Sequence, residues 1–278
     1  MKFDMHCHTK EGSLDSKVPV EEYARQFSKL GYDGFMIADH NSYRGCWAWD
    51  AVCDDSEYAD MTVIRGMEYD TKDAGHILVV LPDGVYPKVM KLRGMRLRRL
   101  ILIVHSLGGV LGPAHPYGVP TSSMMGFKKV NRRLLNHVDF IEVFNTCELP
   151  MSNRLAKSMA ERYHLPGIAG SDCHVTDYIG MAYTEINHQI YCNNDFIRAI
   201  KNHATIEAGG KERIQTLKGK YKDHWIGQTA YRIYNRGIGK LRSPRRGYHQ
   251  YKLSQENRHI RHGYKQFKLR KENRHITL

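Results

Sequence analysis

The sequence lacks an apolar run long enough to cross a membrane. A spanning helix needs about 18 or more consecutive apolar residues, and the best candidate, Leu100–Leu111, is far shorter and contains His105. The first residues also lack the apolar segment typical of a secretion signal. From these absences we expect a protein without a membrane span that is located in the cytoplasm.

Cysteine pairs of the Cys-x-x-Cys type are also missing. The chain of 278 residues has six cysteines, and none of them has the spacing of a zinc ribbon. Disulfide frameworks are typical of oxidising compartments. We therefore expect reduced thiols that mainly serve packing.

Acidic charge is in deficit, and the deficit is confined to one end of the chain. The net charge is +13 overall, but residues 211–278 hold 19 Lys and Arg against 4 Asp and Glu, whereas residues 1–210 hold 23 against 25. This asymmetry predicts a boundary near Gly209 and Gly210. Residues 1–210 then form one domain, long enough to bury a large core, and residues 211–278 form a basic tail.

The basic tail contains a near-duplicate with a period of 16 residues, since Gly247–Ile260 resembles Gly263–Ile276. Two copies are too few for a solenoid, which needs about three units to bury a core. The low aliphatic content indicates a solvated segment that is disordered or transiently helical. Aromatic residues alternate with the positive charges, a pattern that suits single-stranded nucleic acid. A solvated extension without such a partner is the alternative.

The chain begins with two histidines at a spacing that brings their rings together. Residues i and i+2 of a strand share a face, so His6 and His8 can direct two imidazoles at one point. Imidazole is the commonest metal ligand among neutral side chains. The pattern is weak evidence by itself, and it gains weight because similar residues recur at the ends of later apolar runs.

Apolar runs alternate with helical patterns throughout residues 1–210. Beyond the opening strand, strands are expected at residues 33–38, 61–67, 76–81, 110–114, 139–144, 166–170 and 183–186. Helices are expected at residues 20–30, 87–107, 128–137, 152–164 and 194–201, with an aromatic helical segment around Trp47, Trp49 and Tyr58. This alternation favours βαβ units and a parallel sheet. In a closed α/β barrel the carboxyl ends of the strands gather on one face, so polar residues at those ends would meet.

Nine polar residues near strand ends are candidate metal ligands. They are His6, His8, Asp15, His40, Glu68, His76, His115, Asp172 and His174. Nitrogen and carboxylate ligands in this mixture suit Zn, Mn or Fe. Nine ligands exceed the needs of one ion, so we expect two or three divalent ions that share Glu68. Clustered cations activate water and neutralise phosphate oxygens, which is the chemistry of phosphoester hydrolysis.

The motifs HCHT, ADH, GME, GHILVV, AHP, EVFN and GSDCH, in this order, resemble the polymerase-and-histidinol-phosphatase (PHP) superfamily. The resemblance covers about residues 1–208. From EVFN to IGMAYTEI it is closer to the stand-alone PHP phosphoesterases than to the PHP domains of bacterial replicative polymerases. It implies an α/β fold, a distorted (β/α)7 barrel, followed here by the basic C-terminal extension.

The resemblance also implies a trinuclear metal site and roles for its residues. One metal would be held by His6, His8, Glu68 and Asp172, the second by Glu68, His76 and His115, and the third by Asp15, His40 and His174. A metal-bridging hydroxide would be the nucleophile, with Glu68, Asp172 and His174 as the catalytic residues. His174 or a metal-bound water would protonate the leaving oxygen.

Three further residues have open roles. Asn145 stands where many family members have His or Cys, and its role as a ligand or a substrate contact is left open. Arg44 is a candidate phosphate contact. Asp39 either orients the site or closes a turn.

Three functions are therefore compared. The first is a metal-dependent phosphoesterase that acts on a phosphomonoester, a nucleotide or a short oligonucleotide. The second is an amidohydrolase, which also begins with His-x-His on its first barrel strand, although Asp15 and Glu68 fit that family less well. The third is a non-enzymatic nucleic-acid-binding protein that acts through the basic tail.

Overall fold

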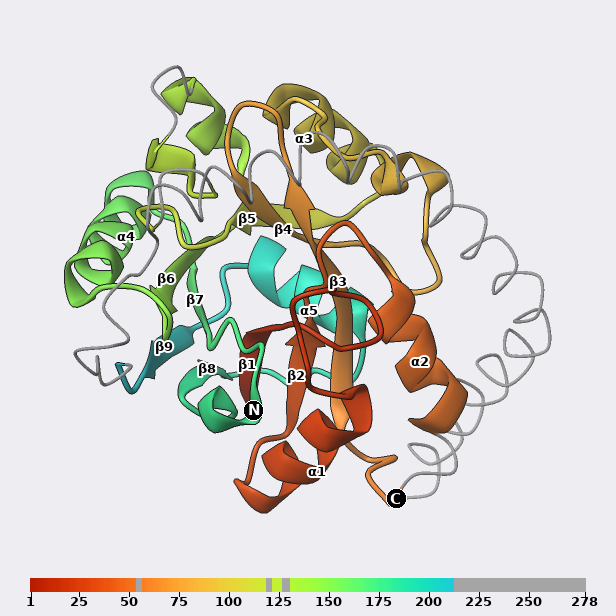
Figure 1. Cartoon of the computed structure of the whole chain (residues 1–278). Helices are drawn as coiled ribbons and strands as arrows, with labels where there is room; N and C mark the ends of the chain where they lie inside the picture. The colour runs from red at the N-terminus through yellow and green to blue at the C-terminus, as the bar shows by residue number, and fades with distance from the viewer. Residues whose placement is uncertain (54–56, 119–121, 127–130, 213–278) are drawn as a thin grey trace. The chain divides into compact units, whose positions relative to one another are not determined.

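The framework of the protein is a seven-stranded sheet joined by a two-stranded one (Figure 1). The computed structural model describes residues 1–53, 57–118, 122–126 and 131–212. Hydrogen-bonded neighbours follow the order β5-β4-β3-β2-β1-β8-β9 in the larger sheet, and β6 pairs with β7 in the smaller. The strands are β1 (Lys2–Cys7), β2 (Gly34–Ile37), β3 (Thr62–Asp70), β4 (His76–Val80), β5 (Val110–Pro113), β6 (Ile141–Asn145), β7 (Gly167–Gly170), β8 (Ala182–Ile186) and β9 (Ile206–Gly210).

The small sheet closes the gap between β5 and β1. On one side, the backbone N–H of Asp139 donates to the carbonyl of Leu111 at 2.8 Å. On the other, the N–H of Asp172 donates to the carbonyl of His6 at 2.9 Å, and Cys7 forms a parallel bridge with Cys173. The curled sheet is thereby a distorted barrel, which confirms the expected fold class.

The strand directions differ from the expected parallel sheet. Strands β1, β2 and β3 are parallel, as are β6 and β7. In contrast, β4 is antiparallel to β3 and β5, and β8 is antiparallel to β1 and β9. The connection Thr71–Gly75 is too short for a crossover, which takes about a dozen residues, so β4 must reverse. Its first residue, His76, consequently lies at the edge where β3 ends.

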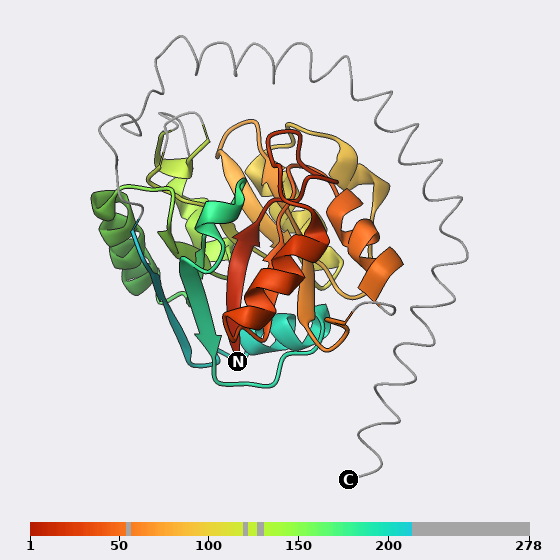
Figure 2. The same cartoon turned by 60° about the horizontal axis from the view of Figure 1, so that its bottom comes forward.

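Five α-helices accompany the strands in the described part of the chain. They are α1 (Val20–Lys29), α2 (Arg44–Val52), α3 (Leu97–Ser106), α4 (Pro150–Tyr163) and α5 (Asn193–Lys201). Short 3₁₀ helices cover Lys88–Lys91, Met124–Gly126, Arg132–His137 and Thr176–Tyr178. Helix α1 lies against β1 and β2 (Figures 1 and 2), with the ring of Phe27 stacked on Phe35 and the ring of Tyr23 tilted against it. Val20, Tyr23, Ala24 and Phe27 give it one buried face, as an amphipathic helix requires.

The barrel core is apolar and lies away from the polar strand ends. Phe3, Ile64, Phe140 and Phe196 belong to one cluster of fully buried side chains. Helix α5 supplies Phe196 and lies near the start of β1, opposite to the loops that follow β1 and β2 (Figure 2). Apolar packing therefore fixes one end of the barrel and leaves the other for chemistry.

Several expected elements are corrected. The helix expected at 87–107 is wrong as a single helix, because Gly94 adopts a left-handed φ of +84° between Lys88–Lys91 and α3. The N–H of Gly94 donates to the carbonyl of Asp70 at 3.0 Å, which ties this break to the end of β3. Tyr58 lies in a turn beyond α2 rather than in a helix. Strand β9 was not expected from the sequence.

The expected helix 128–137 falls partly outside the described residues, and its described part is the 3₁₀ helix Arg132–His137. The basic tail lies outside them from residue 213 onward, so its predicted boundary, order and role stay predictions.

All six cysteines are free thiols, as expected. Among the described residues, no helix combines the length and apolarity needed to cross a membrane.

One compact unit, called the first unit here, contains Met1–Cys46 and the described residues from Asp60 onward. The closed sheet and all nine candidate ligands belong to the first unit. The candidate site is therefore contained within one compact body.

Candidate metal centre

All nine predicted ligands are brought together at one end of the barrel. His6 is on β1 and His8 follows it; His40 follows β2; Glu68 is on β3; His76 begins β4; His115 follows β5; Asp172 and His174 follow β7; Asp15 is in the loop before α1. The parallel strands deliver their ligands at their carboxyl ends, and the reversed β4 delivers His76 at its start.

Glu68 lies at the centre of this cluster, and its side chain is 1 % exposed. Oε1 lies 2.8 Å from His76 Nδ1 and 2.9 Å from His115 Nε2. Oε2 lies 2.8 Å from His40 Nδ1 and 3.5 Å from His8 Nε2. His6 Nε2 is 3.6 Å from Oε1. One buried carboxylate therefore faces five imidazoles, the arrangement expected of a bridging ligand.

His6 and His8 converge as the sequence predicts. Their Nε2 atoms lie 3.0 Å apart, and they lie 3.7 Å and 3.2 Å from Asp172 Oδ1. Ligand atoms about 2.0–2.2 Å from one ion are separated by about 3.0–3.6 Å. The spacing of these donor atoms is therefore that of a coordination shell.

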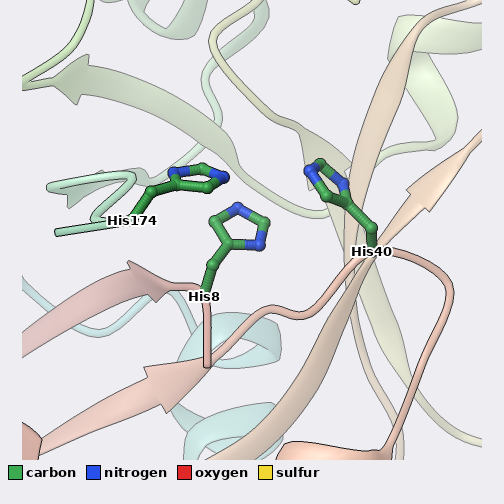
Figure 3. Close-up of side chains that lie close together, drawn as sticks. All are labelled: His8, His40 and His174. Carbon is green, nitrogen blue, oxygen red and sulfur yellow. The ribbon is translucent and has the colours of Figure 1, made fainter. Parts of the chain in front are cut away.

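A second group of rings lies nearer the mouth of the site. His8, His40 and His174 direct their rings towards a shared space (Figure 3), and the His8 centroid is 4.5 Å from that of His40 and 4.3 Å from that of His174. Asp15 Oδ2 lies 3.4 Å from His40 Nε2 and 3.7 Å from His174 Nε2. The His174 and Asp15 side chains are 30 % and 40 % exposed, whereas His6 and His8 are fully buried.

Ligating atoms gather within 4.8 Å of one another in four groups in the described part of the chain. The groups are His6, His8 and Glu68; Glu68, His76 and His115; His8, His40 and His174; and His40, Asp70 and His76. The first group contains three of the four residues that the resemblance implies for one ion, without Asp172, and the second contains the three residues that it implies for another. The third group contains His8 in the place where Asp15 was expected, and Asp15 lies beside this group. The fourth group contains Asp70, which was not predicted from the sequence.

The residues present fit metal ions, because one buried carboxylate oxygen at the centre of the cluster is left without a hydrogen bond from the described residues. Glu68 Oε2 is buried and accepts no hydrogen bond from the described residues. An unsatisfied buried acceptor costs about 1–3 kcal/mol, and more when it is charged. A cation shared with the neighbouring imidazoles removes that cost. The chemistry of the donor set points the same way.

The electrostatics of the cluster also favour cations. Burial alone would lower the pKa of His6, but the carboxylates of Glu142, Asp172 and Glu68 outweigh it and raise the pKa well above its ordinary value. Burial and the neighbouring His174 and His40 lower the pKa of His8 to about 3, so that ring is neutral, as a ligand must be. The raised pKa of His6 shows that the carboxylates of Glu142, Asp172 and Glu68 hold negative charge next to this ring.

Each of the six histidines has one ring nitrogen that faces the other candidate ligands. The second ring nitrogen contacts a carboxylate, a hydroxyl or a backbone carbonyl. His6 Nδ1 is 2.9 Å from Glu142 Oε1, and His76 Nε2 is 2.7 Å from Asp70 Oδ1. The Ser13 hydroxyl lies 3.1 Å from His8 Nδ1, and the Ser123 hydroxyl lies 3.2 Å from His115 Nδ1. His174 Nδ1 lies 2.9 Å from the carbonyl of Asp172. His40 lies between the carboxylates of Glu68 and Asp15. Partners of this kind fix the tautomer and orientation of metal-binding imidazoles.

Glu142 and Asp70 were missed by the sequence reasoning. Asp70 is two residues after Glu68 on β3, so the rule that i and i+2 share a strand face would have found it. Glu142 lies within the motif EVFN, but nothing in that motif connects it to His6, which is 136 residues away.

The three residues with open roles have distinct environments. Asp39 accepts hydrogen bonds from the Thr9 N–H at 2.6 Å and from the Ser13 hydroxyl at 3.0 Å, so it fixes the loop that carries Ser13 to His8. The amide nitrogen of Asn145, not its oxygen, faces the ligands, so Asn145 is not arranged as a metal ligand. Arg44 begins α2, and its predicted phosphate contact stays a prediction.

The distorted α/β barrel gathers histidines and carboxylates at its strand ends, and donor sets of this kind are able to hold metal ions. A family model described as the PHP domain matches residues 4–164, and a second, described as PHP-associated, matches residues 150–205. The chain belongs to the PHP domain family. No curated protein matches it.

Two solved structures show the same fold. A two-domain protein from Bacteroides vulgatus, described as containing a "predicted PHP-like metal-dependent phosphoesterase", has a TM-score of 0.58 at 18 % identity over 76 % of this chain. The alignment spans 65 % of that protein, which is less than two thirds of its length. PsfC from Pseudomonas syringae has a TM-score of 0.54 at 16 % identity, over 83 % of this chain and 97 % of PsfC.

Proposed function

We propose that the protein is a metal-dependent phosphoesterase that hydrolyses a phosphomonoester, a nucleotide or the end of a short oligonucleotide. The observation that carries this proposal is the buried Glu68 carboxylate, which faces five imidazoles while its Oε2 accepts no hydrogen bond from the described residues. Membership of the PHP domain family supports it.

Two or three divalent ions, Mn, Fe or Zn, would be held by the nine ligands. The first inner position would use His6, His8, Glu68 and Asp172, and the second inner position would use Glu68, His76 and His115. The outer position would use Asp15, His40 and His174, with His8 adjacent. Bound ions would supply an activated water at neutral pH and would neutralise the oxygens of the phosphoryl group.

The exposure of the side chains gives the direction from which a substrate would approach. The inner ligands His6, His8 and Glu68 are sealed from solvent, whereas His174 and Asp15 are partly exposed. Asp172 lies between the two groups, with Oδ1 facing His8 and Oδ2 4.0 Å from His115 Nε2. The phosphoryl group would therefore enter past His174 and stop at Asp172.

His174 has two alternative roles that use the same ring nitrogen, so it can fill only one of them at a time. Its Nδ1 is held by the Asp172 carbonyl, so Nε2 is the atom that faces the site. That nitrogen either binds an outer ion or, in a centre with two ions, donates a proton to the leaving oxygen. The number of ions in the active protein decides between the roles.

Phosphate release from a panel of phosphomonoesters, nucleotides and short oligonucleotides tests the proposal. We expect release from one class and a loss of more than about 100-fold in turnover for His8→Ala and Asp172→Asn, since each would be a ligand of the proposed metal centre. His188→Ala, an exposed histidine on the loop after β8, is the matched control and should keep full turnover. Wild-type turnover in either ligand variant contradicts the proposal.

The same assays also test the two other functions. Hydrolysis of cyclic amides without phosphate release would favour an amidohydrolase. Nucleic-acid binding without any hydrolysis would favour a protein that acts through its basic tail, which lies outside the described residues.

A further inference from the structure

Glu142 is a buried carboxylate that no metal position uses, and it contacts two ligands at once. Its side chain is fully buried on β6. Oε1 lies 2.9 Å from His6 Nδ1, while Oε2 accepts the backbone N–H of His115 at 2.5 Å and an amide hydrogen of Asn145 at 3.2 Å. Both oxygens of this carboxylate are therefore occupied by donors from three different segments.

The contact with His6 determines which ring nitrogen is available to an ion. When Nδ1 carries the hydrogen donated to Glu142, the lone pair of His6 is on Nε2. Nε2 is the atom that faces His8 and Glu68. A neutral His6 in the opposite tautomer would present a hydrogen to the ion and could not bind it.

The contact with His115 determines a backbone conformation. His115 has a φ of +28°, outside the regions that non-glycine residues adopt without strain. The hydrogen bond from its N–H to Glu142 holds this conformation. In that conformation Nε2 reaches to 2.9 Å from Glu68 Oε1, inside the group Glu68, His76 and His115.

Asn145 holds Glu142 next to a third ligand. Its amide nitrogen donates to Glu142 Oε2 at 3.2 Å and to Asp172 Oδ2 at 3.4 Å. The amide orientation is fixed because its oxygen accepts the N–H of Cys147 at 2.9 Å. Two carboxylates that would repel each other are thus kept side by side by a neutral donor.

We propose that Glu142, held by Asn145, is a positioning residue that couples the two inner metal positions. One carboxylate orients His6, which belongs to the first position, and His115, which belongs to the second. The inference rests on the proposed metal centre. It goes beyond that centre because it predicts that one residue outside both coordination shells controls the affinity of both ions together.

Only a carboxylate of this length fits. Glutamine has one acceptor oxygen, so in Glu142→Gln either His6 or His115 would face an amide N–H instead of an acceptor. The side chain also has little room to move, because a Cβ added at Gly170 would lie 2.9 Å from Glu142 Oε1 and 2.1 Å from His6 Cβ. Aspartate would be too short to reach both donors.

Titration of the chelator-treated full-length protein with Mn²⁺, followed by calorimetry, tests the coupling. We expect Glu142→Gln to lower the Mn²⁺ affinity of both inner positions together, by about 10- to 100-fold each. Ser123→Ala is the matched control, because within the described residues the Ser123 hydroxyl hydrogen-bonds to His115 Nδ1 alone, so its loss should lower the affinity of one position. Asn145→Ala, which leaves Glu142 in place, should weaken both positions less than Glu142→Gln does, and it tests the coupling independently if Glu142→Gln does not fold.

The outcomes separate this inference from the proposed function. A wild-type protein that binds no Mn²⁺ overturns the metal centre, and the coupling with it. A wild-type protein that binds the ions, with Glu142→Gln or Asn145→Ala weakened at one position only or at none, overturns the coupling alone. Near-ultraviolet circular dichroism of each variant shows whether its fold is kept.

Discussion

At the scale of single residues, Asp70 differs from Glu142 in that it contacts one ligand of the centre and a cation. Its carboxylate lies 2.7 Å from His76 Nε2, accepts the Asn41 side-chain N–H at 3.0 Å and is paired with Arg93. Burial alone would raise the pKa of Asp70, but the charges of His76 and Arg93 hold it well below its usual range. Asp70 is therefore an anion that fixes the His76 ring.

We predict that Asp70→Asn weakens the second metal position only. Asparagine keeps the shape but loses the charge that orients the His76 ring, and a loss of about 10- to 100-fold in affinity is expected for a change of this type. Metal titration gives the result. Asp139→Asn is the matched control, because Asp139 pairs with His105 at 3.0 Å away from the centre. Equal losses in the two variants would contradict the assignment.

The convergence of the nine candidate ligands could be predicted from the sequence, whereas the residues that contact their other ring nitrogens could not. Candidates such as His40 and His115 were recognisable because each follows an apolar run, and strand ends converge in a barrel. The Glu142 contact with His6 depends on how close β6, β7 and β1 lie, which no local pattern reports. Which ring nitrogen faces the site likewise follows only from the three-dimensional contacts.

At the scale of elements, the sequence indicated where most strands and helices lie but not their directions. The short loop Thr71–Gly75 was available as a signal for reversal, yet alternating strands and helices favoured a parallel sheet. The helix expected at 87–107 contained Gly94, whose left-handed conformation ends a helical run. The apolar residues of this segment follow a helical spacing only from Leu97 onward, where α3 buries Leu97, Leu100, Ile101 and Val104.

Strand β7 depends on a glycine where it passes β1. We predict that Gly170→Ala separates the two strands, because the added Cβ would lie 2.1 Å from His6 Cβ and 2.8 Å from its backbone nitrogen. The cost should be about 1–3 kcal/mol in the free energy of unfolding, together with loss of the inner ions. Denaturant unfolding and metal content measure the two effects.

Gly209→Ala on β9 is the matched control for this prediction. The three atoms nearest to a Cβ added there all belong to the outer end of the Tyr183 side chain, at 3.2 Å or more. We expect its stability and metal content to stay close to those of the wild type. A Gly170→Ala variant that also behaves like the wild type would show that β7 can shift without disturbing His6.

At the scale of the whole molecule, the charge asymmetry predicts separate roles for the two parts of the sequence. Strand β9 ends at Gly210, and the Lys211 N–H still donates to the Met181 carbonyl at 2.7 Å. A chain that ends at Glu212 therefore keeps every strand of the sheet. It loses all of the excess positive charge, because residues 1–212 hold 24 Lys and Arg against 26 Asp and Glu.

We predict that this truncated chain keeps its turnover on small phosphomonoesters and loses binding to single-stranded DNA. The full chain should bind with an affinity that falls steeply with salt concentration, because its Lys and Arg residues displace counterions from phosphates. Fluorescence anisotropy at several salt concentrations measures this. If turnover falls only on oligonucleotides, the tail recruits substrate; unchanged DNA binding in the truncated chain contradicts the prediction.

The metal centre is the claim on which the other predictions depend, and metal content tests it most directly. Plasma mass spectrometry on the full-length protein, purified without chelator, should find two to three equivalents of Mn, Fe or Zn per chain. Glu68→Gln should bind fewer, because it removes the shared carboxylate. One equivalent or none in the wild type, with no uptake when Mn²⁺, Fe²⁺ or Zn²⁺ is added, would contradict the account.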